Sequence, residues 1–351
     1  MAFRVIHIGI GGRGRHWLEF IKGLADVESV ACVDLDQNAL DEVRADTGCE
    51  TFTDLDQAFA ETKADGVVIA SPSLLHGRLA LQALEAGYGV MVEKPLAASL
   101  EEAVSVVEFA RSVKRPLMVA ENYRFFRAER TLRKALDEGM VGRVQSAVCV
   151  DRRNQPSDTQ GAWVKSMAQP FLTEIAVHHF DSFRYLFDRR PVSVWAESFN
   201  SAGSDYEQNG AADVLIEMED GLRVQYSGSF IGSRYEYNLW IYGERGELRT
   251  DRSRVWHRSA GERGYREVPA VAMPEGEPLR YPHAGMVAML NQFQAAISGD
   301  DIPETSGADN LWTLAMFDAA VESVETERYV SIDDVLRSEL RTRAGITEGS
   351  S

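Results

Sequence analysis

Cysteine is scarce in this sequence, and the pattern of the few that occur excludes two kinds of site. Of 351 residues, only Cys32, Cys49 and Cys149 are cysteines. Because their number is odd and no two are spaced as CxxC, the sequence predicts neither a disulfide framework nor a zinc site. Cys32 and Cys149 lie in apolar, strand-like runs, so we interpret them as buried thiols. No group of residues has the spacing of metal ligands, and no metal site is predicted.

Long hydrophobic runs and positive charge are scarce as well. No window of eighteen apolar residues exists, which argues against a membrane span. The N-terminus has no basic segment followed by a long apolar stretch, which argues against a signal peptide. Lys and Arg number 37 against 54 Asp and Glu, a formal charge of −17, so a basic surface for nucleic acid is not expected. We therefore predict a cytoplasmic protein that binds neither nucleic acid nor membranes.

The first part of the chain alternates short apolar strands with helical segments. Such alternation predicts an α/β fold with a parallel, doubly wound sheet. Ligands in these sheets bind beyond the carboxyl ends of the strands. Four polar residues, Asp34, Ser71, Lys94 and Asn122, follow expected strands and fall at such ends. The length of 351 residues is enough for this domain and a second one.

A glycine-rich stretch, Gly9–Gly14, separates the first expected strand from the first expected helix. Its sequence GIGGRG fits the pattern GxGxxG, in which glycines allow a tight turn and a close approach of backbone to pyrophosphate. Asp34 lies twenty residues past Gly14, where a carboxylate can accept a hydrogen bond from a ribose hydroxyl. The alternative is a solvated Asp34 beside a purely structural turn. Asp34 and Asp36 together would repel a 2′-phosphate, so NAD is preferred over NADP.

Strands crowd together in the second part of the chain, after Phe126. Turns such as Glu219-Asp220-Gly221 separate some of them, which predicts hairpins and a largely antiparallel sheet. We expect helices to cover one face of this sheet and aromatic side chains to occupy the other. An exposed apolar face of that size would favour a homodimer or homotetramer. The candidates for this open face are Trp195, Tyr226, Tyr237 and Trp240.

The segment Phe171–Asp181 carries the residues best suited to acid–base chemistry. Glu174 and His178 are four positions apart, so in a helix they lie on one face. A carboxylate and an imidazole placed in this way can orient, protonate and deprotonate a substrate hydroxyl. We expect both to meet Lys94 at the reactive end of the dinucleotide. His179 lies about 100° further around the helix and is expected to pack or to contact substrate.

These motifs together resemble the glucose-fructose oxidoreductase / inositol dehydrogenase / rhizopine catabolism (Gfo/Idh/MocA) family, from about Arg4 to Val330. Besides the glycine stretch, Ser71-Pro72-Ser73-Leu74-Leu75-His76 is similar to the family's TPNxxH, and Glu93-Lys94-Pro95 is its EKP motif. The segment around His178 is similar to DxGxHxxD. There Glu174 replaces the Asp and Ala176 the Gly, while His178 and Asp181 are retained.

The resemblance implies the domain organisation. It implies an N-terminal Rossmann domain, residues 1–123, and a C-terminal α/β domain with an open, mostly antiparallel sheet, residues 124–345. Residues 346–351 are expected to form a disordered tail. The resemblance also implies NAD(P)-dependent oxidation or reduction of sugars or cyclitols, and oligomers packed through the C-terminal sheet.

The candidate site residues are assigned to three roles, and Lys94 is assigned to two of them. Catalysis is assigned to Lys94, His178 and Glu174. Cofactor contacts are assigned to Gly9, Gly11, Gly12, Arg13, Gly14, Asp34, Ser71, His76, Glu93 and Asn122. Substrate contacts are assigned to Lys94, Arg124, Arg152, Trp163, Lys165 and Asp181. Because Arg152 and Arg153 are adjacent after an expected strand, only one of the two is expected to face the cleft.

The function that we predict is an NAD-dependent dehydrogenase oxidising a secondary hydroxyl of a sugar, sugar derivative or cyclitol. In it, His178 takes the hydroxyl proton, Lys94 polarises the oxygen and Glu174 orients the acid–base system. Two alternatives stay open. One is an NAD-assisted glycosidase that acts by transient oxidation and elimination. The other is a non-catalytic NAD-binding sensor, although a sensor has no need for both Lys94 and His178.

Overall fold

The computed structural model describes residues 2–157, 164, 167–200, 202–299 and 301–346. The chain divides into two compact units. The first unit comprises Met1–Asn122, Gly276–Leu311 and Glu339–Ser350, and the second comprises Tyr123–Glu275, Trp312–Ser338 and Ser351. The predicted tail falls almost entirely outside the described residues, as do Trp163 and Lys165.

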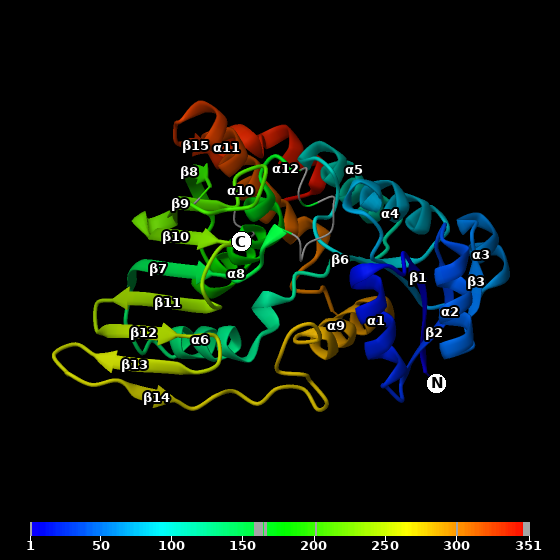
Figure 1. Cartoon of the computed structure of the whole chain (residues 1–351), viewed down its shortest axis with the longest axis horizontal. Helices are drawn as coiled ribbons and strands as arrows, with labels where there is room; N and C mark the ends of the chain where they lie inside the picture. The colour runs from blue at the N-terminus through cyan, green and yellow to red at the C-terminus, as the bar shows by residue number, and fades with distance from the viewer. Residues whose placement is uncertain (1, 158–163, 165–166, 201, 300, 347–351) are drawn as a thin grey trace. The chain divides into compact units, whose positions relative to one another are not determined.

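A six-stranded sheet forms the centre of the first unit, and its strands, blue to cyan in Figure 1, run in the order β3-β2-β1-β4-β5-β6. Every neighbouring pair is parallel, which confirms the predicted doubly wound sheet. The strand order reverses between β1 and β4, and ligands of such sheets bind at this point. The strands are β1 (Phe3–Ile8), β2 (Val27–Val33), β3 (Glu50–Phe52), β4 (Gly66–Ile69), β5 (Gly89–Val92) and β6 (Leu117–Val119).

Helices follow the strands of the first unit, and short polar side chains start several of them. Asp36, Asp54 and Ser99 each accept a hydrogen bond from a backbone N–H in the first turn of the next helix, the usual geometry of an N-cap. The helices are α1 (Gly12–Lys22), α2 (Gln37–Thr47), α3 (Leu55–Glu61), α4 (His76–Glu85), α5 (Leu100–Ser112), α9 (Met286–Ser298) and most of α12 (Ser338–Ala344).

A nine-stranded sheet forms the centre of the second unit, in the order β14-β13-β12-β11-β7-β10-β9-β8-β15 (Figure 1). The β7–β10 pair is parallel and the other neighbouring pairs are antiparallel, which confirms the expected mostly antiparallel sheet. The strands are β7 (Val144–Arg152), β8 (Pro191–Phe199), β9 (Ala211–Met218), β10 (Arg223–Ser229), β11 (Glu236–Gly243), β12 (Gly246–Thr250), β13 (Val255–Ser259), β14 (Arg266–Val268) and β15 (Val330–Ser331).

Three helices lie wholly within the second unit, among the residues that the structure describes. They are α6 (Arg127–Asp137), α8 (Val177–Phe187) and α11 (Ile332–Val335), while α10 (Gly307–Thr326) begins in the first unit and ends in the second. A π-helical turn, Leu172–Ala176, leads directly into α8. The predicted helix around Glu174 and His178 is therefore present, but its first turn is wound more widely than an α-helix.

The two faces of the nine-stranded sheet have different environments. Tyr226 and Tyr237 are 1% and 3% exposed, and their rings lie 4.8 and 5.5 Å from the ring of His179 in α8. They therefore face the helix-covered side, which corrects the prediction that they lie on the open face. The opposite side, which we call the outer face, carries a row of paired positions from strand to strand: Trp195, Leu215, Gln225, Val148, Trp240, Arg249 and Trp256.

Within the described part of the chain, none of the helices has both the length and the apolar character needed to cross a membrane. The same residues contain no group of three or more His, Cys, Asp or Glu side chains arranged to hold a metal ion.

Candidate active site

The turn between β1 and α1, Gly9–Gly14, has a backbone that only glycine fits at two positions. A Cβ on Gly9, whose φ is +86°, would lie 2.5 Å from the backbone nitrogen of Ser71. A Cβ on Gly14 would lie 2.1 Å from the carbonyl oxygen of Gly9. At Gly11, in contrast, nothing lies within 4 Å of a Cβ position. The glycine turn is therefore closely packed at Gly9 and Gly14 but open at Gly11. The turn leads into the N-terminus of a helix, where phosphate binding is favoured.

Asp34, the residue after β2, connects the end of this strand with the glycine turn and with the start of α2. Its Oδ2 accepts the Ile10 N–H at 2.9 Å, and its Oδ1 accepts the Asp36 N–H at 3.0 Å. Asp36 is the N-cap of α2. The Asp34 carboxylate is therefore fixed beside the glycine turn, and the Asp36 carboxylate is fixed at the start of α2. Each carboxylate oxygen of Asp34 can accept a second hydrogen bond, which leaves capacity for a ribose hydroxyl.

Ser71 lies just past the end of β4, next to the glycine turn, and His76 begins α4. The Ser71 Oγ is buried and has no hydrogen-bond partner among the described residues. The ring of His76 is 1% exposed, with Nδ1 2.7 Å from the Pro95 carbonyl and Nε2 2.8 Å from the Ser71 carbonyl. His76 therefore connects the segments that follow β4 and β5, and both of its ring nitrogens are engaged. Of the two residues, Ser71 is the one whose side chain is left to bind a ligand.

Glu93, the residue after β5, accepts hydrogen bonds from the first helix. Its Oε1 accepts from Arg13 Nε at 2.8 Å and from the Trp17 indole at 2.7 Å. Burial alone would raise the pKa of Glu93, but Arg13 and the Trp17 hydrogen bond hold it below its usual value. Glu93 and Arg13 thus bind one another, and they fix the strand end that carries the half-buried Lys94. After β6, Asn122 Nδ2 donates to the Ala284 carbonyl at 3.3 Å.

In the second unit, Glu174 lies in the π-helical turn and His178 in the first turn of α8. Glu174 is half-buried and His178 is buried. The His178 imidazole stacks on the Tyr123 ring, with centroids 4.4 Å apart and planes inclined by 16°. Wide π-helical turns inside helices are frequent at functional sites. Lys94 belongs to the first unit, whereas Glu174 and His178 belong to the second.

Beside His178, the second unit contains a buried ionic cluster of Asp151, Arg153 and His179. The Asp151 Oδ2 lies 2.8 Å from His179 Nε2 and accepts from Arg153 Nη2 at 2.9 Å. Arg153 Nη2 also donates to the Tyr123 hydroxyl at 2.9 Å. Because Tyr123 stacks on His178, the cluster supports the ring of the candidate acid–base residue.

Burial sets the protonation of this cluster. Burial lowers the pKa of His179 to about 3 in spite of the nearby Asp151, so His179 is neutral at neutral pH. Burial alone would raise the pKa of Asp151, but Arg153 and the hydrogen bond to His179 hold it well below its usual range. The cluster is therefore an Arg–Asp ion pair with a neutral histidine, and His179 serves packing, one of the two roles expected for it.

Arg252 supports the Tyr123 ring from another side. Its guanidinium carbon lies 4.3 Å from the ring centre of Tyr123 and 3.9 Å from that of Tyr237, distances typical of cation–π contacts. Its Nε lies 3.4 Å from the buried carboxylate of Glu129. Burial nevertheless raises the pKa of Glu129 to about 7.

The structure places the predicted substrate contacts in different surroundings. Arg124 Nε donates to Asp181 Oδ2 at 2.8 Å, and the two side chains are 5% and 0% exposed. These two predicted contacts are therefore bound to each other. Arg152 donates to Ser227 on the outer face, at 3.0 Å, whereas Arg153 points to the His179 side. The two adjacent arginines therefore lie on opposite sides of the sheet, and Arg153 is the one on the helix-covered side.

Asp151, Arg153, Tyr123 and Arg252 were not assigned site roles from the sequence, although Arg153 was considered beside Arg152 as a possible substrate contact. One signal for the first two was present, because Cys149, Asp151 and Arg153 alternate along β7 and its extension, and alternate residues share a face. Arg252 carries no comparable signal in the sequence. It reaches Tyr123 only through the folding of β12 and the turn that follows.

Comparisons with known proteins identify the family. Residues 3–121 match the family described as "Oxidoreductase family, NAD-binding Rossmann fold", and residues 130–249 match the "GFO/IDH/MocA C-terminal domain". The chain belongs to the GFO/IDH/MocA family of oxidoreductases. This family member is 29% identical to inositol 2-dehydrogenase from Rhizobium meliloti over 337 residues, which cover 95% of this chain and 100% of that protein.

Two further similarities extend over nearly the whole of this GFO/IDH/MocA chain. D-apiose dehydrogenase from Paraburkholderia graminis is 26% identical over 94% of this chain and 90% of that protein. The crystal structure of a putative myo-inositol dehydrogenase from Sinorhizobium meliloti has a TM-score of 0.78 at 26% identity, covering 94% of this chain and 100% of that one. The predicted Rossmann fold, the oxidoreductase class and the cofactor NAD are thereby confirmed.

Proposed function

We propose that this protein is an NAD-dependent dehydrogenase that oxidises a secondary hydroxyl of a sugar, a sugar derivative or a cyclitol. The observation that carries the proposal is the similarity to an inositol 2-dehydrogenase, which extends over the full length of that protein. The similarity to a D-apiose dehydrogenase widens the substrate class from cyclitols to sugars. Lys94, Glu174 and His178, placed on strand and helix ends, supply the groups that such a reaction needs.

The residues around the glycine turn fit the cofactor. The open space at Gly11 leaves room for pyrophosphate, and the buried Ser71 hydroxyl has no partner among the described residues. We assign the ribose hydroxyls to the Asp34 carboxylate, and keep Asn122 as a candidate contact. When bound there, NAD supplies the hydride acceptor.

The side chains of the chain handle the proton and the charge. Lys94 Nζ donates a hydrogen bond to the reacting hydroxyl oxygen and stabilises the negative charge that develops on it. An imidazole nitrogen of His178 accepts the hydroxyl proton. The Glu174 carboxylate orients this acid–base pair or a neighbouring hydroxyl. Tyr123, stacked on His178 and held by Arg153, fixes the plane of the imidazole.

A substrate screen tests the function directly. The full chain is incubated with NAD and a panel of sugars, sugar derivatives and inositols, while NADH absorbance and the carbohydrate products are followed. The expected result is NADH formed in step with a ketone product. Sugar released from a glycoside without net NADH would contradict the dehydrogenase and favour the glycosidase. NAD binding without turnover of any compound would favour the sensor.

We also propose that the outer face of the nine-stranded sheet joins copies of this chain into a homodimer or homotetramer. Trp195, Trp240 and Trp256 lie half-buried in the row that crosses this face. A face with so many aromatic side chains favours association. Light scattering should show an oligomer that Trp240→Glu dissociates, whereas Leu279→Glu, at an exposed leucine of the first unit, should leave it intact. A wild-type monomer at micromolar concentration would contradict this proposal.

A further inference from the structure

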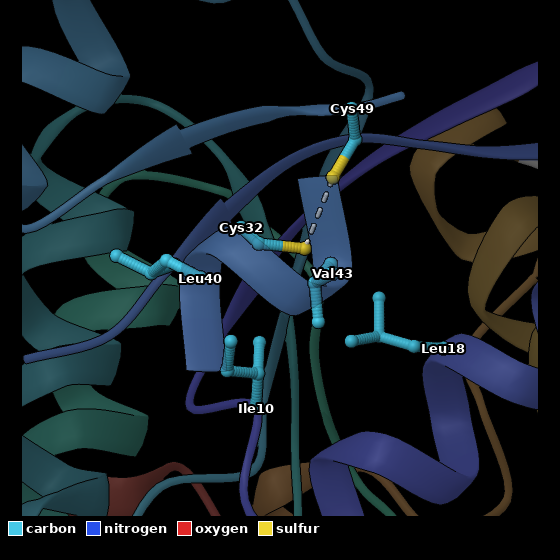
Figure 2. Close-up of a cluster of buried hydrophobic side chains, with 6 residues drawn as sticks. All are labelled: Ile10, Leu18, Cys32, Leu40, Val43 and Cys49. Carbon is cyan, nitrogen blue, oxygen red and sulfur yellow. Dashed lines mark hydrogen bonds between the residues drawn. The ribbon is translucent and has the colours of Figure 1, made fainter. Parts of the chain in front are cut away.

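Two of the three cysteines lie next to each other in the first unit. Cys32 is in β2, and Cys49 lies between α2 and β3. Figure 2 shows their sulfur atoms pointing toward one another within an apolar cluster, and the Cys49 Sγ–H donates to Cys32 Sγ at 3.5 Å. The remaining members of this cluster are Ile10, Leu18, Leu40 and Val43.

The surroundings give the two thiols different accessibility. Cys32 is 0% exposed and Cys49 is 7% exposed. Cys49 also lines a cavity of about 600 Å³, whose wall includes the polar side chains of Lys22, Asp46 and Lys63. Cys49 is therefore the cysteine that a small polar oxidant in this cavity meets, whereas Cys32 is fully buried and is not part of the cavity wall.

The hydrogen bond between the sulfurs also makes the two thiols chemically different. The Cys32 thiol can donate to a Cys49 thiolate, and this interaction lowers the pKa of Cys49 to about 7. The same interaction raises the pKa of Cys32, and burial raises it further. Because the thiolate is the reactive form, Cys49 is the nucleophile and Cys32 the partner that follows.

We propose that Cys49 and Cys32 form a dithiol that peroxide oxidises to an intramolecular disulfide. The Cys49 thiolate attacks one peroxide oxygen, the O–O bond breaks, hydroxide leaves and a sulfenic acid remains. Cys32 sulfur then attacks Cys49 sulfur, an S–S bond forms, and the sulfenic hydroxyl leaves with the Cys32 proton as water. Two thiols are oxidised by two electrons in total, and one hydrogen peroxide is reduced to two waters.

Closure requires the sulfurs to approach from 3.5 Å to a bond length of about 2.0 Å. The chain beside Cys49 can adjust, because Gly48 precedes it in the left-handed conformation, at φ +73°, with nothing within 4 Å of its Cβ position. An intracellular disulfide of this kind is more often a transient, redox-sensing one than a structural one.

The disulfide acts on the segment that faces the cofactor. Ile10 lies within the glycine turn and packs in the same cluster as Cys32, while its N–H donates to Asp34, two residues beyond Cys32. Drawing Cys49 toward β2 disturbs this packing. Resting on the proposed placement of NAD at Asp34, we expect the disulfide to weaken NAD binding by about tenfold, a usual size for coupling between two sites.

Peptide mapping of the full chain tests the dithiol. Trypsin cuts after Arg44 and so separates Cys32, in residues 23–44, from Cys49, in residues 45–63. After peroxide treatment and blocking of free thiols, mass spectrometry should find these two peptides joined, and a reductant should separate them. Cys149, fully buried in β7, is the internal control and should stay a free thiol in residues 144–152. Oxidation of Cys49 to sulfenic or sulfinic acid while Cys32 stays free would overturn the proposal.

A binding experiment tests the coupling separately. NAD affinity is measured by titration calorimetry on the reduced and the disulfide forms, with Cys49→Ser before and after peroxide as the control. We expect about tenfold weaker binding only for the wild-type disulfide form. Equal affinity of the two wild-type forms would overturn the coupling. Neither experiment uses substrate turnover, so a failure of the proposed dehydrogenase reaction would not be mistaken for a failure of the dithiol.

Discussion

The glycine turn of the first unit and the buried ionic cluster of the second are built in different ways. The glycine turn is made of backbone, and the contacts of Gly9, Gly14 and Asp34 involve residues near the ends of neighbouring parallel strands. The buried ionic cluster is made of side chains, and Asp151, Arg153 and His179 stabilise each other away from water. Backbone geometry tolerates few residue types, whereas a buried charge tolerates few changes of charge. Variants of the two regions should therefore fail in different ways.

The largest effect is expected for the residues that we propose to carry the chemistry. Lys94→Ala in the first unit and His178→Ala in the second should each lower kcat by about 10²–10⁴, the usual scale for losing an oxyanion or acid–base group. NAD affinity should change little, because neither residue is assigned to the adenosine half. Turnover and NAD binding are measured on the same samples. Glu174→Gln should be milder if Glu174 only orients the others.

Another lysine of the first unit provides the matched control for Lys94→Ala. Lys63→Ala removes a lysine of the first unit that has no assigned part in the chemistry, and kcat should stay within error of wild type. Full activity of His178→Ala would refute its role as the acid–base residue.

The next effect concerns the buried ionic cluster alone. Asp151→Asn keeps the shape of the side chain but leaves the charge of Arg153 without its counterion. The free energy of unfolding of the second unit should fall by about 3–5 kcal/mol, as when one partner of a buried ion pair is removed. Urea unfolding, followed by a probe in the second unit, measures the change.

Asp137→Asn is the matched control for this experiment. Asp137 pairs with Arg133 along α6, but its side chain is 56% exposed, so its loss should cost less than about 1 kcal/mol. If both variants lowered the free energy of unfolding by the same small amount, the cluster would be no more important to stability than a surface ion pair.

Much of the fold could be predicted from the sequence because its signals are local. The glycine turn and the strand–helix alternation depend on neighbouring residues, and the structure contains both. The assignment of Tyr226 and Tyr237 to the open face was wrong for a physical reason. The face of a strand residue depends on register, and one position of shift reverses it.

The side-chain part of the candidate site was less predictable because its contacts are long-range. Tyr237 pairs with Asp151 across β11 and β7, and His179 reaches Asp151 from 28 positions away. Pairing of this kind follows from the register of strands that are distant in sequence. Which of Arg152 and Arg153 lies on the helix-covered side follows from the same register, since the two adjacent residues point to opposite sides of the sheet.

A smaller effect is expected of pH on the free energy of unfolding, and a buried histidine in each unit contributes to it. Burial lowers the pKa of His7 and of His179 from 6.5 to about 3 in the folded protein. The unfolded chain therefore binds protons first as the pH falls, so each histidine stabilises the fold above pH 6.5 and loses this contribution on the way to pH 3. The expected slope is about 1.4 kcal/mol per pH unit for each histidine.

Unfolding free energies measured between about pH 6.5 and 5, where most carboxylates stay ionised, isolate this slope. His7→Gln should reduce it in the first unit and His179→Gln in the second. A slope that neither variant changes would mean that other groups take up the protons.

The smallest effect is expected for cofactor preference, which tests the region of the glycine turn by itself. NAD should bind more tightly than NADP, because at the proposed ribose site the carboxylates of Asp34 and Asp36 would repel the extra phosphate of NADP. Asp34→Asn removes one charge while its amide oxygen can still accept a hydrogen bond from Ile10 or Asp36. The NAD-to-NADP affinity ratio should therefore fall by about tenfold, with the glycine turn retained. Asp34→Ala should lower the NAD-to-NADP affinity ratio as well. It should also weaken the binding of NAD, because both hydrogen bonds from backbone N–H groups are lost. Titration of each variant with both cofactors separates the two effects, and a wild-type preference for NADP would show that Asp34 is not at the ribose.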